Sequence, residues 1–269
     1  MADGLAASQP EPELPRSDAA SAAEPGIRAA ARPAYYAARS GGWRDWWTLL
    51  HPPYTAWHLS YVVIGAALAP HVDISRLVAT LLAFLAAVGV SAHALDEIHG
   101  RPLRTGIPTA TLVAATVVGL AVAVGLGAAG VARVGWVLVP FIVAGPALVV
   151  AYNAELFGGV VHTDAGFALA WGAFPLLTAY AAQAGGLGPA PVLGAVGAFA
   201  LSYAQRSLST PARMLRRQVA DVHGAMTLSD GTVLAVDDAV LRAPLERALR
   251  AMSWSVMALA AAVAVARLR

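Results

Sequence analysis

The sequence predicts an all-α fold, a polytopic bundle of about seven transmembrane helices. Of its 269 residues, 58% are hydrophobic and only 13% are charged, against roughly 45–50% and about 25% in soluble domains. The mean hydropathy is +0.62. Long uncharged runs reach the ~20 residues that cross a bilayer core of ~30 Å. This composition argues against a soluble globular enzyme.

The first part of the chain, residues 1–42, is expected to be a disordered tail. It is rich in alanine, proline and serine and has no apolar period that could bury a face. Order is expected to begin at Trp43, Trp46 and Trp47, on a short helix at the level of the lipid headgroups that ends before Pro52. The transmembrane helical domain is therefore placed at residues 43–269.

Seven apolar stretches follow, each close to the length of one span. They cover residues 54–70, 76–95, 109–131, 134–152, 165–184, 189–208 and 246–266. Several glycines within them permit close approach of neighbouring helices, and we interpret these glycines as packing positions. They are Gly119, Gly125, Gly127, Gly194 and Gly197.

The arginines predict the orientation in the membrane. With seven spans, 14 arginines lie on the side of the N-terminus, and Arg76, Arg133, Arg267 and Arg269 lie on the other. The positive-inside rule then places the N-terminus in the cytoplasm and the C-terminus outside the cell membrane.

A cytoplasmic loop is expected at residues 209–245. Ser209 or Thr210 is expected to cap a new helix with Pro211 at its first position. A small hairpin is expected between residues 227 and 236, with its turn at Asp230-Gly231, and Pro244 then opens the final span.

Several classes of function are disfavoured by residue usage. The absence of cysteine excludes disulfides, thiolate metal sites and cysteine nucleophiles. A net charge of +2 on a membrane protein does not indicate nucleic-acid binding. All 18 basic residues are arginine, which hints at a GC-rich bacterial genome.

A first polar cluster lies at the end of the second span. His93, Asp96 and Glu97 share one face of a helix, and His99 lies about 60° from Asp96. Ionisable groups at the end of an apolar span indicate a functional site by default. The alternative is a polar helix end in contact with headgroup water.

A second polar cluster, between the fourth and fifth spans, contains Glu155, His162 and Asp164. A tight reversal at Gly158-Gly159 brings Glu155 towards the other two. The loop has no arginine, so these side chains suit a cation better than a phosphate. The alternative is a solvated connection in which Asp164 caps the fifth span.

A third cluster is basic and consists of Arg206, Arg213, Arg216 and Arg217. Guanidinium groups suit phosphate, diphosphate or anionic lipid headgroups. The alternative is a positive-inside anchor that needs no ligand.

In the order of these features the chain resembles the UbiA superfamily of intramembrane prenyltransferases, over about residues 45–217. The resemblance is carried by the stretch Leu49 to Pro53, the acidic end of the second span, the triplet Arg101-Pro102-Leu103 and the basic segment after the sixth span. It implies a bundle, usually of eight or nine spans, whose two aspartate-rich motifs hold Mg²⁺ and an allylic diphosphate. The resemblance gives Asp96 and Glu97 the catalytic role, and Arg101, Arg213, Arg216 and Arg217 the binding of substrate phosphate.

Most of both motifs is missing, so the resemblance is to a divergent member of the family. The first family motif, N-D-x-x-D-x-x-x-D, falls on Ala92, His93, Asp96 and Gly100, and no acidic residue lies between Arg206 and Ala220. Two Mg²⁺ ions on a diphosphate need more carboxylate oxygens than these positions supply.

Three functions follow from these observations. The first is a UbiA-like transferase that acts on an isoprenoid or another membrane lipid and uses Mg²⁺. The second is a membrane enzyme with Zn²⁺, Fe or Mn²⁺. Its candidate metal ligands are His93, Asp96, Glu97, His99, Glu155, His162 and Asp164. The third is a non-catalytic lipid-binding or carrier protein. In each case we expect the first two clusters to meet at the cytoplasmic mouth of the bundle.

Overall fold

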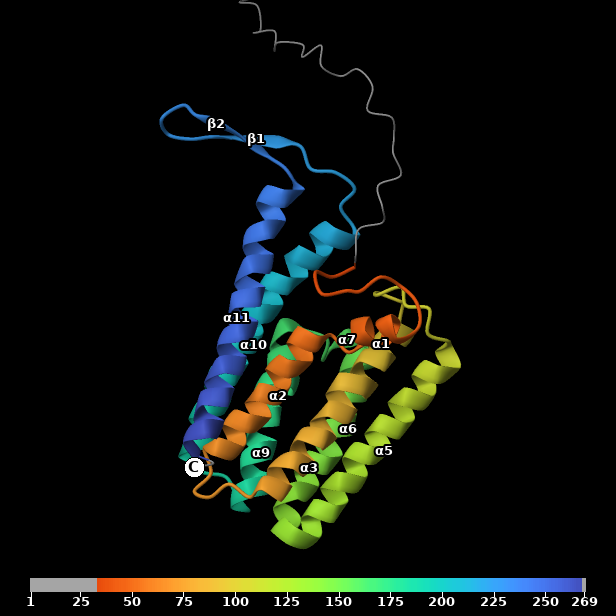
Figure 1. Cartoon of the computed structure of the whole chain (residues 1–269), viewed down its shortest axis with the longest axis vertical. Helices are drawn as coiled ribbons and strands as arrows, with labels where there is room; N and C mark the ends of the chain where they lie inside the picture. The colour runs from red at the N-terminus through yellow and green to blue at the C-terminus, as the bar shows by residue number, and fades with distance from the viewer. Residues whose placement is uncertain (1–32, 268–269) are drawn as a thin grey trace, which may run out of the picture. The chain divides into compact units, whose positions relative to one another are not determined.

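The computed structural model describes residues 33–267, and its long elements are all helices (Figure 1). The all-α fold class is therefore confirmed. In the first half of the chain the elements are α1 (Trp43–Leu49), α2 (Pro52–Ala67), α3 (Ile74–Phe84), the π-helix η1 (Leu85–Ala92), α4 (His93–Ile98), α5 (Thr109–Val134), the 3-10 turn η2 (Trp136–Leu138) and α6 (Val139–Asn153).

The second half adds five further α-helices, a second π-helix and the two strands. They are α7 (Leu156–Gly159), α8 (Asp164–Ala168), the π-helix η3 (Leu169–Ala173), α9 (Phe174–Ala184), α10 (Pro189–Arg217), β1 (Gly224–Thr227), β2 (Val233–Val236) and α11 (Asp238–Arg267). Elements α3, η1 and α4 form one continuous helix, and so do α8, η3 and α9.

Five helices of the described chain are long and apolar enough to cross a membrane, fewer than the seven spans expected. They are Ile74–Ile98, Thr109–Val134, Trp136–Asn153, Asp164–Ala184 and Asp238–Arg267. The other two expected stretches are helical as well. However, α2 has only 16 residues, and α10 carries polar side chains, including Gln205 and Arg206, before its end.

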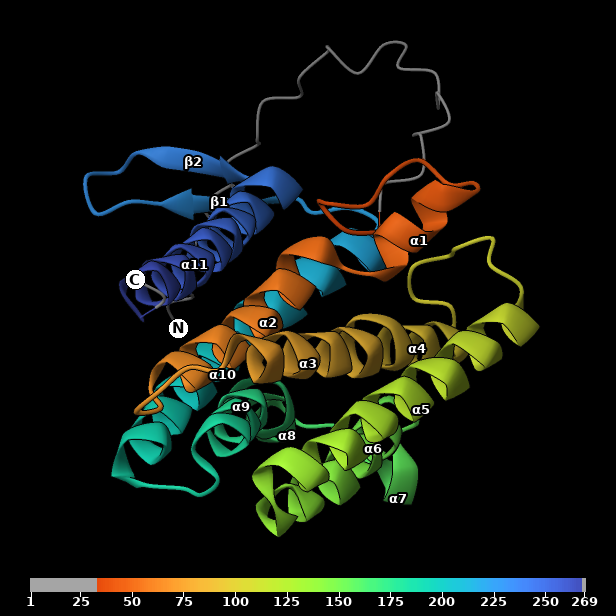
Figure 2. The same cartoon turned by 60° about the horizontal axis from the view of Figure 1, so that its bottom comes forward.

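Helix α2 lies in the middle of the packing. Figure 2 shows it between α11 and α3, and it also packs along α9. It buries Trp57, Tyr61 and Val62 almost completely. At Gly65 the backbone of α9 comes so close that an added Cβ would lie 2.2 Å from the carbonyl oxygen of Leu176. Glycine is therefore required at this contact.

The expected glycine contacts exist at three of five positions. A Cβ at Gly119, Gly127 or Gly194 would collide with a neighbouring helix, at 2.2 to 2.9 Å. Gly125 and Gly197 have nothing within 4 Å, so the packing role predicted for them is wrong.

The connecting segments divide between the two ends of the bundle (Figure 1). Helix α1, α7 and the hairpin lie towards one end, and the C-terminal end of α11 lies at the other (Figure 1). At this second end, Arg76 donates hydrogen bonds to the carbonyl oxygens of Gln183 and Arg133, and Arg267 donates to that of Ala67. Arg76 and Arg267 therefore stabilise exposed ends of helices.

Three local expectations need correction. Residues 33–42 do not belong to a disordered tail, because Ala34 and Ala37 are buried; residues 1–32 lie outside the described part. No helix begins at Ser209 or Thr210, because α10 runs through Pro211 to Arg217. Helix α11 begins at Asp238 and contains Pro244 in its interior. In both helices packing against the partner helix outweighs the missing proline N–H.

The predicted hairpin is confirmed. Strands β1 and β2 pair antiparallel, with Thr227 opposite Val233. The turn is closed by hydrogen bonds between Leu228 and Thr232 and from Gly231 to Leu228, and Gly231 takes the positive φ of 86° that glycine tolerates best.

Reporter fusions test the orientation. We expect fusions at Arg217 and at Arg269 to report opposite sides of the membrane, with Arg217 in the cytoplasm, because 14 of 18 arginines lie on that side. Cytoplasmic signals from both fusions would mean that the number of spans is wrong by an odd number.

Candidate functional site: an arginine and histidine cavity at one end of the bundle

Two π-helical segments shape the candidate site. A π turn interrupts the regular i to i−4 hydrogen bonding of a helix and is often found at functional sites. In η3 the carbonyl oxygen of Trp171 accepts a hydrogen bond from His58 Nδ1 at 2.8 Å. In η1 the Ser91 hydroxyl donates to the carbonyl oxygens of Ala86 and Thr116. Val88 of η1 and Trp171 of η3 both line the cavity described next.

A polar cavity of about 460 Å³ lies among α2, α4, α6, α10 and the segment before α1. Its polar and charged lining residues include Tyr35, Tyr36, His51, Tyr54, His58, His93, Asp96, His99, Tyr152, Asn153, Glu155, His162, Gln205, Arg206, Ser209, Arg213, Arg216, Arg217 and Glu246. The structure therefore brings the three predicted clusters to one cavity.

Three predicted site residues do not line this cavity: Glu97, Arg101 and Asp164. Glu97 is fully buried and accepts hydrogen bonds from the backbone N–H groups of Leu103 and Thr105, at 2.9 and 2.8 Å, and from the Thr105 hydroxyl. Both of its carboxylate oxygens are thus used to hold the loop after α4. This geometry supports a structural role for Glu97, where catalysis and metal binding were expected.

Arg101 also holds the loop after α4. It donates hydrogen bonds to the Ile107 carbonyl oxygen at 2.6 Å and to the Thr109 hydroxyl. The buried carboxylate of Asp45 accepts from the N–H of Gly106. This role of Asp45 was not predicted from the sequence, because only the fold brings α1 next to this loop.

The glycine reversal brings Glu155 towards His162, as expected, whereas no contact of Glu155 with Asp164 is found among the described residues. Gly158 and Gly159 both have positive φ angles, and Glu155 Oε1 lies 3.9 Å from His162 Nδ1. Asp164 pairs with Arg206 at 3.2 Å. The capping role predicted for Asp164 is wrong, because Thr163 is the N-cap of α8 and its hydroxyl accepts from Gly166 N–H.

Three histidines of the cavity share one arrangement. The Nδ1 atoms of His58, His93 and His162 lie 2.8, 3.1 and 2.9 Å from the carbonyl oxygens of Trp171, Gly89 and Tyr152. A carbonyl oxygen only accepts, so each Nδ1 carries the proton in this arrangement. In a neutral ring Nε2 is then a hydrogen-bond acceptor.

The arginines on α10 differ in how they are neutralised. Arg206 pairs with Asp164, and Arg216 pairs with Glu246 of α11. Among the described residues no carboxylate lies within ion-pair distance of Arg213 or Arg217.

Within residues 33–267 the hydrogen-bond partners of these two arginines are neutral. Arg213 is 3.5 Å from the Thr210 hydroxyl, and Arg217 Nε donates to the Pro33 carbonyl oxygen at 3.1 Å. They therefore supply the positive charge of the cavity.

An aromatic wall borders the cavity. It was not predicted from the sequence. The Tyr36 ring contacts the rings of Tyr54 and His51, and His51 stacks on His93 with the ring centres 4.3 Å apart. Burial, with the neighbouring His93 and arginines, lowers the pKa of His51 well below its ordinary value, so His51 is neutral. The sequence feature that could have indicated this wall is the pair Tyr35-Tyr36, the only aromatic residues before Trp43.

Four buried polar atoms in residues that line the cavity have no hydrogen-bond partner in the described part of the chain. They are Tyr35 Oη, His51 Nε2, Tyr152 Oη and Gln205 Oε1. Buried polar groups are nearly always hydrogen-bonded, to protein, water or a ligand. Their grouping around one cavity indicates a site that binds polar groups.

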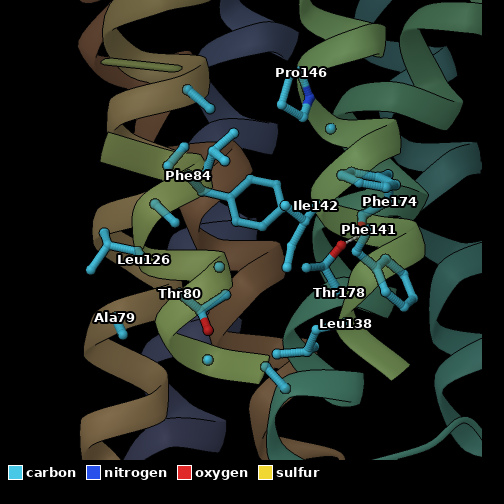
Figure 3. Close-up of a pocket in the computed structure, with 18 of the residues that line it drawn as sticks. Ala79, Thr80, Phe84, Leu126, Leu138, Phe141, Ile142, Pro146, Phe174 and Thr178 are labelled. Carbon is cyan, nitrogen blue, oxygen red and sulfur yellow. Dashed lines mark hydrogen bonds between the residues drawn. The ribbon is translucent and has the colours of Figure 1, made fainter. Parts of the chain in front are cut away.

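An apolar pocket of about 320 Å³ lies between α3, α5, α6 and α9 (Figure 3). Phe84, Phe141 and Phe174 line it. Its two threonine hydroxyls, of Thr80 and Thr178, donate to carbonyl oxygens of their own helices. The pocket therefore presents mainly apolar surface, apart from Ser75, Arg76 and Arg133, which also line it. It shares two lining residues, Val88 and Trp171, with the polar cavity.

The described residues, 33–267, contain no group of three or more His, Asp or Glu side chains placed to hold a metal ion. A divalent metal at His93, Asp96 or His162 remains a prediction of the sequence. Metal analysis of the detergent-purified protein tests it.

Comparison of the chain with models of known protein families, with curated proteins and with solved structures gives no match. The functional assignment therefore depends on the chemistry of the site itself.

Proposed function

We propose that this chain is an integral membrane protein that binds a lipid with an anionic headgroup. The headgroup lies in the polar cavity and the apolar chain in the pocket of Figure 3. One observation carries the proposal: the cavity and the pocket share two lining residues, Val88 and Trp171. A polar site beside an apolar one matches an amphiphilic molecule.

The charge of the cavity favours a phosphate-bearing headgroup. Arg213 and Arg217 are partly buried and lack a carboxylate partner among the described residues. Guanidinium groups bind phosphate through paired, charge-assisted hydrogen bonds.

The length of the pocket favours a single long chain. Its lining along η3 and α9 extends from Ala170 to Ala182. At 1.5 Å per residue this is roughly 18 Å, somewhat more than half of the ~30 Å hydrocarbon core. An isoprenoid or an acyl chain of that length fits, and its burial would supply most of the affinity.

The UbiA resemblance extends this proposal to an enzyme. In that form the protein is a transferase in a seven-span bundle with a cytoplasmic N-terminus. Of the carboxylates expected for metal in the first motif, only Asp96 lines the cavity. Glu246 is paired with Arg216. We therefore expect the protein to bind the lipid but not to catalyse the chemical step of the family.

An activity assay tests this expectation. We expect no Mg²⁺-dependent transfer of a polyprenyl group from its diphosphate to an aromatic acceptor at the rates usual for enzymes, because too few carboxylate oxygens are available. Robust transfer that Asp96→Ala abolishes would contradict this and establish a conventional member of the family.

A blocked pocket tests the binding proposal. Ala83 lines the pocket, whereas its neighbour Leu82 is exposed on the outer face of α3 and does not line it. We expect Ala83→Trp to remove most lipid that co-purifies with the protein, as measured by mass spectrometry of extracts, and Leu82→Trp to leave it unchanged. Equal lipid content in both variants would refute the proposal.

A further inference from the structure

We propose that the headgroup bound in the polar cavity is a phosphodiester monoanion that carries hydroxyl groups, as in a phosphoglycerol headgroup. This inference rests on the proposed lipid-binding function and specifies its ligand. It comes from the unequal chemistry of the cavity walls: α10 contributes hydrogen-bond donors with positive charge, and the opposite wall contributes neutral acceptors.

The acceptor wall is formed by histidines of α2 and α4. His58 and His93 hold Nδ1 against backbone carbonyl oxygens, which leaves Nε2 as the acceptor of a neutral ring. The Nε2 atom of His51, the ring stacked on His93, is buried without a partner among the described residues. The dianion of a phosphate monoester, which has acceptors only, cannot pair with these nitrogen lone pairs. Hydroxyl groups can, because they donate.

Gln205 supplies a further acceptor. Its side chain is 2% exposed, and Oε1 has no partner in the described chain. Because Gln205 lies next to Arg206 on α10, acceptors also reach the donor side of the cavity. A ligand that satisfies this wall must bring donors close to its anionic group.

The charge balance specifies a monoanion. The pairs Arg206 with Asp164 and Arg216 with Glu246 are internally neutral. Arg213 and Arg217 then face one cavity carboxylate, Asp96, while Glu155 lies at the rim with its side chain 49% exposed. With Asp96 ionised, the interior carries one net positive charge. A phosphodiester balances this charge, whereas a zwitterionic headgroup does not.

Single-chain probes that differ only in the headgroup test the inference. We expect dodecylphosphoglycerol to bind the maltoside-solubilised full chain at least tenfold more tightly than dodecyl phosphate or dodecylphosphocholine, measured by calorimetry. His93→Phe keeps a flat ring but removes the acceptor, so it should lower the affinity for dodecylphosphoglycerol about tenfold and leave that for dodecyl phosphate unchanged. His223→Phe, at an exposed histidine of the loop before β1, is the matched control.

The outcomes separate this inference from the function on which it rests. Equal affinity for the three probes, or equal weakening of both anionic probes by His93→Phe, would overturn the hydroxylated headgroup and leave lipid binding in place. No binding of any probe would overturn the proposed function itself. Gln205→Met removes a different acceptor at similar size and should reproduce the selective loss, which keeps the test valid if His93→Phe fails to fold.

Discussion

Replacement of Arg213 and Arg217 together by glutamine should lower the affinity for an anionic amphiphile about a hundredfold. Each arginine lines the cavity without a carboxylate partner in the described chain, so its charge is available to a ligand. A hydrogen bond to a charged group contributes about 1.5–3 kcal/mol, so two lost phosphate contacts account for a change of this size.

The matched control for this variant is Arg247→Gln. Arg247 is exposed on α11 and does not line the cavity, so the control removes one arginine charge outside the site. Titration of dodecyl phosphate by calorimetry should show an unchanged affinity in the control and only a tenfold loss in Arg213→Gln alone. If the double variant binds as tightly as the unmodified protein, the arginines are only membrane anchors, and phosphate recognition is refuted.

The second large effect is on stability. Glu97→Ala should lower the free energy of unfolding by about 3 kcal/mol, since it leaves the buried N–H groups of Leu103 and Thr105 without their acceptor. Glu97→Gln should also be strongly destabilising, because its NH₂ group would face an N–H donor. The measurement is the melting temperature of the detergent-solubilised protein, with limited proteolysis of residues 99–107.

Thr105→Val is the control for Glu97. It removes only the hydroxyl contact to Glu97 and should cost about 1 kcal/mol. A Glu97→Gln variant with unchanged melting temperature but lost ligand or metal binding would contradict the structural role. It would restore the site role that the sequence suggested.

The sequence by itself determined the helical class, the hairpin and the gathering of the polar clusters. Apolar runs of span length must be helical, because a bilayer offers backbone groups no other partners. Asp230-Gly231 encodes its turn locally. His93 and His162 line one cavity because successive antiparallel helices return polar ends to the same end of the bundle.

Only the tertiary structure decided which polar residues face the cavity. Asp96 and Glu97 are neighbours in sequence, but 100° of helix rotation turns Asp96 towards the cavity and Glu97 towards the loop that it holds. Tyr36 gains its place only through contact with His51 and Tyr54.

The junction of the two binding regions was also decided by tertiary structure. Val88 and Trp171 lie in π-helical segments and line both regions. The Trp171 carbonyl oxygen accepts a hydrogen bond from His58, 113 residues earlier in the chain. A π turn replaces local hydrogen bonds by longer-range ones. The free-energy cost of the π turn is offset by distant hydrogen-bond partners. Hydrophobic periodicity and helix propensity act over a few residues and do not encode these partners.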